Sequence, residues 1–271
     1  MSAAPSELLD LARSVALEAA ALVRERATGT VEVAATKSSD VDVVTAADRA
    51  SEELIRDRIL RARPDDSILG EEGDDVDGTT GVRWVVDPID GTVNFLYGLP
   101  AYAVSIAAEV EGEVVAGVVV DVAHRTVYTG HLDPAAGPTG GVAERDGVPL
   151  AVRRPAPLSH RLIATGFSYS REVREVQGAA VARLLPRIRD IRRGGSCALD
   201  LCLVASGQLD GYVEEGVNHW DHAAAGLVAR LAGARLLLTP GAGGRDAVVC
   251  GPDHGFEELL SVVREAGFLR E

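Results

Sequence analysis

A twelve-residue segment of the sequence places two carboxylates close together on a turn. Residues 84–95 read WVVDPIDGTVNF, in which Asp87 ends an apolar run and Asp90 follows three residues later. Pro88 fixes its own φ and disfavours helical geometry at the preceding residue, so we expect a strand to stop at Asp87. Both carboxylates can then project to the same side of the strand end. Such a pair suits a hard cation such as Mg²⁺.

The backbone of the same turn offers further polar groups. The Ile89 carbonyl is expected to belong to no regular ladder, so it is free to act as an oxygen ligand. Gly91 lets the backbone approach a ligand closely, and the amides of Gly91 and Thr92 would suit a phosphate oxygen. Asp-Pro and Asp-Gly are also ordinary turn dipeptides. Their combination after a Trp-led strand favours a metal and phosphate site.

Three other acids are candidates, and each has a structural alternative. Glu71 in ILGEEG follows a predicted strand, where it is either a metal ligand supplied by a second strand or part of the acidic loop that continues to Asp77. Asp48 comes three residues after Thr45, which is the spacing of a helix capping box. Asp221 lies at the start of a predicted helix, where a carboxylate is a routine cap.

Two histidines flank Asp221. His219 and His222 could be transition-metal ligands, but no cysteine or third histidine lies nearby in the sequence. Surface or supporting positions are therefore the favoured interpretation for both.

The elements that must position these residues differ between the two halves of the chain. The first half is predicted as two helices followed by a long antiparallel meander, and the second as alternating strands and helices. The seam falls at residues 153–159, so we predict an N-terminal α+β subdomain over residues 1–154 with most of the metal ligands. Residues 155–271 would form an α/β subdomain that completes the active site. Helices are predicted at 6–26, 48–63, 173–186, 196–206, 220–232 and 253–266, and strands at 67–70, 82–87, several segments of 101–131, 161–167, 189–193, 209–215, 234–238 and 247–250.

The composition excludes several classes of protein. The 271 residues are 46% hydrophobic, but no apolar run approaches the ~20 residues of a membrane span. A formal net charge of −14 argues against unassisted binding to nucleic acid. An anionic substrate would be repelled by this charge unless bound cations neutralised it. The start of the chain lacks the basic segment of a secretory signal. Three cysteines without a C-x-x-C pair indicate a reduced, cytoplasmic protein.

Four motifs occur in an order that resembles a known family. They are KSSDVDVVTAAD, GEE, WVVDPIDGTVNF and WDHAA, the last at residues 220–224. The chain resembles the inositol monophosphatase family of lithium-sensitive, Mg²⁺-dependent phosphatases, and the similarity covers essentially its whole length. The resemblance implies a mixed α/β fold, a layered α-β-α-β-α sandwich, and a homodimer.

The resemblance also implies a set of site residues. Glu71, Asp87 and the Ile89 carbonyl would hold one Mg²⁺, and Asp87, Asp90 and Asp221 a second, with a third, weaker ion near Glu71. The catalytic residues would be Glu71, Thr92, which positions the attacking water, and Asp48, which accepts a hydrogen bond from Thr92. Lys37 matches the lysine of a mobile loop in the family. Substrate contacts would come from Asp90, Gly91, Thr92, Gly195, Ser196, Cys197, Glu214 and Asp221. The implied reaction is in-line displacement by metal-activated water, inhibited by Li⁺ and without a phosphoenzyme.

The substrate is the open question at this point. A small phosphorylated polyol or sugar is expected, foremost inositol 1-phosphate, because Glu214 favours a polyol. Histidinol phosphate, fructose 1,6-bisphosphate and nucleotide 3′-phosphates are alternatives on the same metal core. The chain departs from the family pattern around residues 216–222, which affects the leaving group. A non-enzymatic alternative is a regulatory partner of the transcription or RNA machinery, which would be expected to show a degraded metal site or a basic surface.

Overall fold

The computed structural model describes residues 3–28, 33–36, 43–137 and 139–270. Lys37 lies outside these ranges. The helices are α1 (Pro5–Arg26), α2 (Ala46–Ala62), α3 (Thr92–Tyr97), α4 (Arg171–Leu184), α5 (Cys197–Ala205), α6 (His219–Leu231) and α7 (Phe256–Ala266). The strands are β1 (Val33–Thr36), β2 (Val43–Thr45), β3 (Ser67–Gly70), β4 (Val82–Asp90), β5 (Ala103–Val110), β6 (Glu113–Asp121), β7 (Thr126–Leu132), β8 (Gly141–Arg145), β9 (Val148–Pro149), β10 (Leu162–Thr165), β11 (Asp190–Arg192), β12 (Gly211–Glu215), β13 (Ala234–Pro240) and β14 (Asp246–Pro252). The elements predicted from periodicity are present, with ends that differ by a few residues.

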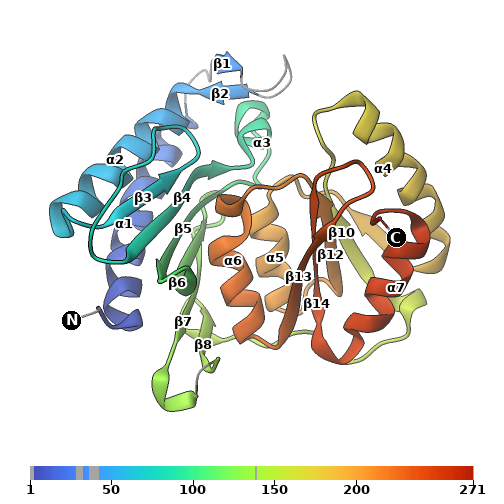
Figure 1. Ribbon diagram of the computed structural model, residues 1–271. Helices are drawn as coiled ribbons and strands as arrows, with labels where there is room; N and C mark the ends of the chain where they lie inside the picture. The colour runs from blue at the N-terminus through green and yellow to red at the C-terminus, as the bar shows by residue number, and fades with distance from the viewer. Residues whose placement is uncertain (1–2, 29–32, 37–42, 138, 271) are drawn as a thin grey trace.

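Helices and sheets alternate in five layers (Figure 1). Helices α1 and α2 pack on one face of a seven-stranded sheet, and α5 and α6 lie between that sheet and a five-stranded one. Helices α4 and α7 cover the outer face of the second sheet. The predicted α-β-α-β-α sandwich is confirmed.

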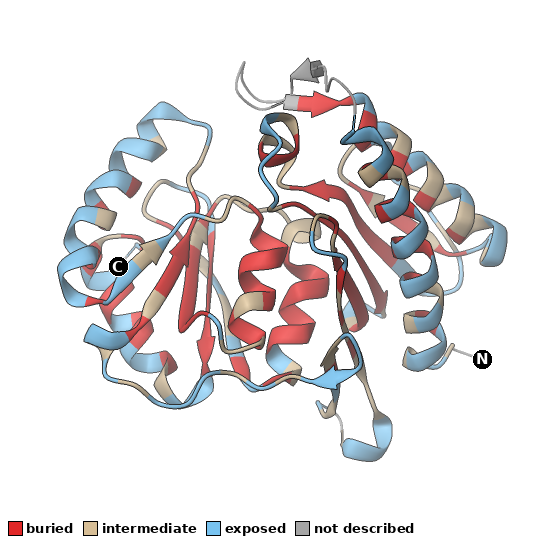
Figure 2. Cartoon of the chain, turned by 180° about the vertical axis from the view of Figure 1, so that it is seen from behind, coloured by how far each residue is buried: buried red, intermediate tan, exposed pale blue. Residues whose placement is uncertain are grey.

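The central helices have the composition that this position requires. Helix α5 reads CALDLCLVA and is buried on nearly every side, as Figure 2 shows for both central helices. A helix that is apolar all round is stable only inside the molecule. Small residues let α6 approach the first sheet closely, since a Cβ added to Gly117 would lie 2.9 Å from the Ala224 Cα.

The pairing of β3 with β4 brings two acids to one edge of the first sheet. The strands are parallel, with Gly70 opposite Val86. Glu71, which follows β3, and Asp87, which follows Val86 within β4, are therefore neighbours at this end of the two strands. The rest of this sheet is the predicted antiparallel meander, in the order β4-β5-β6-β7-β8-β9.

The predicted end of β4 at Asp87 is wrong. Pairing with β5 continues to Asp90, which lies opposite Ala103, while Asp87 lies opposite Ser105. Three steps along β4 thus match two along β5, which is a bulge with one extra residue. Pro88 has no N–H to donate, and a bulge is one of the few places in a sheet that tolerates this. The strand therefore passes the proline instead of ending at it.

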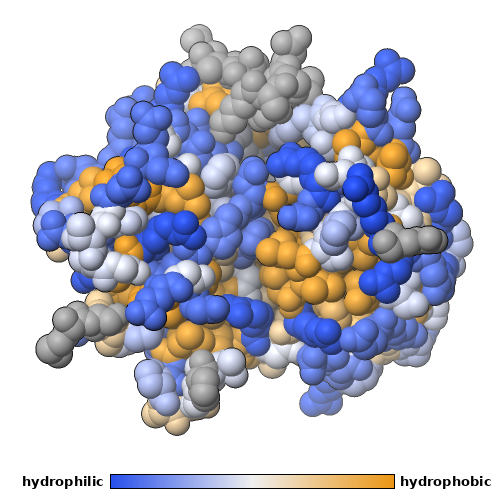
Figure 3. Space-filling model, viewed as in Figure 1, coloured by the Kyte–Doolittle hydropathy of each residue, from blue (hydrophilic) through white to orange (hydrophobic). Residues whose placement is uncertain are grey.

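The second sheet has the order β11-β10-β12-β14-β13 and is mixed. Strand β10 runs parallel to β11 and β12, whereas β14 is antiparallel to both of its neighbours. Figure 3 shows apolar side chains gathered where β13 forms the edge of this sheet. The predicted division at residue 154 falls between the last strand of one sheet and the first of the other, and it stays a prediction. Within the described ranges, no helix is both long and apolar enough to cross a membrane.

Candidate active site

Three aspartates from distant parts of the chain meet at one point. Asp87 and Asp90 come from the bulged end of β4, and Asp221 is the third residue of α6. One carboxylate oxygen from each residue lies within 4.8 Å of the others. They line a cavity of about 450 Å³, to which Glu71 and Ile89 also contribute.

The first turn of α6 holds Asp221 in place. The Asn218 backbone N–H donates to Asp221 Oδ2 at 2.5 Å, which forms a capping box at the start of the helix. Asp221 therefore does cap α6, as the structural alternative predicted. The cap does not exclude a metal role, because a carboxylate can accept several interactions and Asp221 also belongs to the aspartate cluster.

Asp48 likewise combines a structural contact with a contact in the site. Its Oδ2 accepts the Thr45 backbone N–H at 2.8 Å and the Thr45 hydroxyl at 2.5 Å, which caps α2. Its Oδ1 accepts the Thr92 hydroxyl at 3.0 Å, which is the hydrogen bond that the family resemblance implies. The same hydroxyl lies 3.1 Å from the Ile89 carbonyl oxygen. The catalytic roles of these residues stay a prediction.

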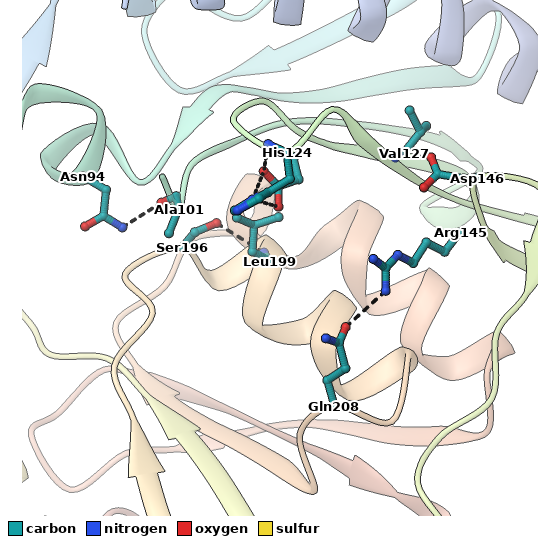
Figure 4. Close-up of polar contacts among 10 residues, drawn as sticks. Asn94, Ala101, His124, Val127, Arg145, Asp146, Ser196, Leu199 and Gln208 are labelled. Carbon is teal, nitrogen blue, oxygen red and sulfur yellow. Dashed lines mark hydrogen bonds and ion pairs between the residues drawn. The ribbon is translucent and has the colours of Figure 1, made fainter. Parts of the chain in front are cut away.

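Asp90 is tied to the start of α5. Its Oδ2 accepts the Ser196 hydroxyl at 2.5 Å and the Ala198 N–H at 2.7 Å, and its Oδ1 accepts the Cys197 N–H at 3.3 Å. Ser196 also caps α5, since its hydroxyl oxygen accepts the Leu199 N–H (Figure 4). Ser196 lines a second cavity of about 300 Å³, not the one with the aspartates. The structure thus places this predicted substrate residue behind Asp90.

Asn94 joins two loops next to this contact. Its side-chain N–H₂ donates to the Ala101 carbonyl at 2.7 Å, the contact drawn in Figure 4. The same group donates to the Gly194 carbonyl at 2.9 Å, so the segment before Ser196 is held against the first sheet. The following residues, Gly195 and Cys197, both line the aspartate cavity.

The carboxylates of the cluster oppose one another's ionisation. Burial raises the pKa of Asp87 well above its ordinary value, and the charges of Glu71, Asp90 and Asp221 raise it further. Burial also raises the pKa of Asp221 well above its ordinary value, and the charges of Asp90, Glu71 and Glu214 raise it further. Burial raises the pKa of Asp90 to about 6, although hydrogen bonds from Ser196 and Ala198 act in the opposite direction. An electropositive group is needed to stabilise the ionised forms.

These residues fit a divalent cation. The donors are all carboxylate or carbonyl oxygens, which hard cations such as Mg²⁺ prefer, and they come close enough to share an ion. No arginine or lysine in the described ranges is paired with the three aspartates. A cation would therefore supply the positive charge that no arginine or lysine in those ranges supplies by pairing with the three aspartates.

The lining of the aspartate cavity also contains residues that the sequence did not single out. Glu214, which was predicted, lies one residue before the end of β12 and accepts the Tyr212 hydroxyl at 2.7 Å. Burial raises the pKa of Glu214, whereas Tyr212 and Arg193 act to lower it. The lining also includes Trp220, which belongs to the WDHAA motif, and Phe167, Ser168, Tyr169, Ser170, Val173, Arg193 and Arg245, which were not singled out. The sequence could have predicted several of these residues, because they follow strands β10 and β12, whose parallel pairing brings the ends of the two strands together.

Of the two interpretations offered for the histidines, a surface position does not apply to His222, and a supporting position stays a prediction. This residue is buried in α6, with 8% of its surface exposed, and burial together with His219 lowers its pKa to about 4. The rings of His219 and His222 meet edge to face, with centroids 5.2 Å apart. Neither residue lines the aspartate cavity. Helix α6 lies between the two sheets, so residues on several of its sides are covered.

Comparison with known proteins places the chain in a family. The model of the inositol monophosphatase family matches residues 4–265. The inositol-1-monophosphatase SuhB of Mycobacterium tuberculosis strain H37Rv is 48% identical over an alignment of 276 residues that covers 96% of this chain and 94% of the relative. The Nus factor SuhB of Escherichia coli is 33% identical over 246 residues, which cover 90% and 89%.

Solved structures agree with this placement. Mycobacterium tuberculosis SuhB superposes with a TM-score of 0.81 at 44% identity, covering 98% of this chain and 99% of the other. The inositol monophosphatase of Anabaena (Nostoc) sp. PCC 7120 superposes with a TM-score of 0.80 at 30% identity, covering 96% of each chain. Motif order, fold and aspartate cluster thus lead to one conclusion: the chain belongs to the inositol monophosphatase family.

Proposed function

We propose that this phosphatase hydrolyses inositol 1-phosphate to myo-inositol and phosphate, with Mg²⁺ as its cofactor. The observation that carries the proposal is the convergence of Asp87, Asp90 and Asp221 in one cavity, which Glu214 also lines. The name of the Mycobacterium tuberculosis relative, which is 48% identical, supports the same substrate.

The carboxylates would hold the metal as the family resemblance implies. Glu71, Asp87 and the Ile89 carbonyl would bind one ion, Asp87, Asp90 and Asp221 a second, and a third would lie near Glu71. When bound, the ions neutralise the carboxylates, orient the phosphate and activate water for attack on phosphorus. Li⁺ inhibition is part of the proposal, because the site offers only hard oxygen ligands.

Thr92 and Asp48 would position the attacking water. The Thr92 hydroxyl donates a hydrogen bond to Asp48, so its oxygen lone pairs remain to accept a hydrogen bond from water. Thr45 donates twice to the other Asp48 oxygen, which fixes the direction of that carboxylate. The water is thereby oriented with a lone pair free for the phosphorus atom.

The remaining contacts would bind the substrate itself. Gly91 has a φ of +96°, and an added Cβ would come within 2.8 Å of the Ala101 carbonyl oxygen, so only glycine follows this backbone path. Its amide and that of Thr92 would face the phosphate. Glu214 would accept hydrogen bonds from polyol hydroxyls. Gly195 and Cys197 would line the same pocket, and Ser196 would act by holding Asp90.

A panel of phosphate esters tests this assignment. The purified protein should hydrolyse inositol 1-phosphate with a higher kcat/KM than histidinol phosphate, fructose 1,6-bisphosphate or a nucleotide 3′-phosphate, and EDTA should abolish turnover. A higher kcat/KM for one of the other three esters would replace inositol phosphate as the substrate. Turnover that survives EDTA would refute the metal site.

One finding favours a second function. The Escherichia coli relative carries the name Nus factor SuhB, which matches the regulatory alternative drawn from the sequence. The intact cluster of aspartates argues for catalysis as the main function. Co-purification of RNA polymerase with the tagged protein, unaffected by Asp90→Asn, would support a regulatory role in addition. The homodimer and the cytoplasmic location remain predictions.

A further inference from the structure

A buried acid in the first sheet has no part in the proposed mechanism. Strand β5 reads AVSIAAEV, and its Glu109 is only 2% exposed. A carboxylate in such a place destabilises the fold unless charged or hydrogen-bonding partners surround it. Its presence in an apolar strand therefore needs a reason.

Both oxygens of Glu109 are occupied. Oε2 accepts the Arg83 Nε–H at 2.6 Å, from the residue opposite it on β4. Oε1 lies 2.5 Å from His219 Nε2, on the first residue of α6. Burial alone would raise the pKa of Glu109, but His219 and Arg83 hold it below its ordinary value. Glu109 thus joins the first sheet to the start of α6.

The same turn is held from the other side. The Arg245 guanidinium, in the turn between β13 and β14, donates to the Asn218 side-chain oxygen at 3.3 Å. Glu215 in turn accepts the Arg245 backbone N–H at 2.9 Å. Asn218 and His219 belong to the segment that departs from the family pattern. In this structure they contact elements of the second and first sheets, respectively.

Repulsion within the aspartate cluster explains why the start of α6 needs the contacts that Asn218 and His219 make. Asp221 reaches Asp87 and Asp90 only through the placement of α6, and the charges of these residues repel one another. Repulsion tends to move α6 away from β4. The Glu109–His219 contact acts in the opposite direction, and the buried His222 ring packs against His219 from within the helix.

We propose that Glu109 and His219 form a latch, completed by Arg83, that positions Asp221 for metal binding. The proposal rests on the metal site proposed above. His219 is a positioning residue, since it acts through the first turn of α6. The latch should matter most for the affinity of the metal ions, because their ligands come from both β4 and α6.

Metal affinity measured without turnover tests the latch. Mn²⁺ is titrated into the protein, and the free ion is followed by its EPR signal. His219→Ala should weaken Mn²⁺ binding by roughly 10-fold, in the range of supporting contacts at metal sites. His219→Gln, whose amide can still donate to Glu109, should bind within about 3-fold of wild type. If His219→Ala does not fold, Glu109→Gln replaces it with the same expected direction.

A destabilised control separates positioning from general loss of stability. Val262→Ala removes buried methyl groups from α7, which covers the outer face of the second sheet, whereas the latch joins the first sheet to α6. This variant should lower the melting temperature without changing Mn²⁺ affinity. Wild-type affinity in His219→Ala would overturn the latch, as would an equal loss in Val262→Ala. Absence of Mn²⁺ binding in the wild type would instead refute the proposed metal site, and the latch with it.

Discussion

At the scale of single residues, Asp90 combines a proposed role in metal binding with a structural role at the start of α5, and a substitution can distinguish the two. It belongs to the aspartate cluster and accepts three hydrogen bonds from the start of α5. Asp90→Asn keeps an oxygen for part of that network but removes the charge needed by a cation. We expect a folded protein whose Mg²⁺-dependent kcat/KM falls by more than about 100-fold. Circular dichroism and steady-state kinetics check this, and near wild-type activity would exclude Asp90 as a ligand.

Thr92 separates water positioning from metal binding. Thr92→Ala removes the hydroxyl bound to Asp48, and kcat should fall by roughly 10²–10⁴-fold while Mn²⁺ affinity stays unchanged. Thr92→Ser keeps the hydroxyl and should retain most of the rate. If kcat hardly changes in the alanine variant, Asp48 serves only as the cap of α2.

Glu214 is the residue on which substrate preference should depend. Its carboxylate lies on the wall of the cavity and is held by the Tyr212 hydroxyl. Loss of a charged hydrogen bond costs about 1.5–3 kcal/mol, so Glu214→Gln should lower kcat/KM for inositol 1-phosphate by roughly 10- to 100-fold. An aryl phosphate, which has no hydroxyls to offer, should be hydrolysed at the wild-type rate. Equal losses on both substrates would indicate a structural effect.

At the scale of elements, Asp66 fixes the start of β3 against β4. It is 1% exposed, accepts the Trp84 Nε1–H at 2.9 Å and the Thr80 hydroxyl at 2.5 Å, and pairs with Arg63. Burial acts to raise its pKa, but these three partners bring it below the ordinary value of 3.8. Asp66 therefore matters for the register that places Glu71 beside Asp87.

Asp66→Asn should lower the free energy of unfolding by about 2–4 kcal/mol at pH 7. Because the pKa of Asp66 is lower in the folded protein, its ionised form stabilises the fold above pH ~4, and this contribution is lost as the pH falls through the folded pKa. Urea unfolding at pH 7 and pH 3 should show the difference between variant and wild type shrinking in acid. A difference that does not depend on pH would show that the charge is unimportant.

At the scale of the whole molecule, the buried carboxylates of the site lower the free energy of unfolding of the metal-free protein. Folding raises the pKa of Asp87, so the metal-free protein loses stability as the pH rises above the ordinary value of 3.8. At pH 7, Asp87→Asn should therefore raise the melting temperature in EDTA by a few degrees, or about 1–2 kcal/mol. Mg²⁺ should raise the melting temperature of the wild type but hardly that of the variant. A variant less stable than wild type in EDTA would contradict this account.

The sequence by itself determined the elements and the local chemistry. Hydrophobic periodicity located the long helices and the meander, because burial of one face imposes the period of each element. The Thr45–Asp48 spacing predicted a helix cap that is present. The twelve-residue motif located Asp87 and Asp90, since both acids and their turn lie within one short segment. The grouping of Asp221 and Glu71 with them came from the family resemblance, not from spacing.

Only the tertiary structure decided which of these residues meet. Asp221 reaches β4 across more than a hundred residues, and Ser196 turned toward Asp90 because α5 begins there. The contact of Arg245 with Asn218 and that of Glu109 with His219 could not be predicted from local sequence. Each joins segments that are far apart in the chain, and hydrophobic periodicity does not indicate which distant segments meet. The bulge at Pro88 also depended on a partner, since β5 kept β4 paired beyond the proline. Local sequence sets the conformation of a segment, whereas the packing of sheets and helices sets which segment ends share a cavity.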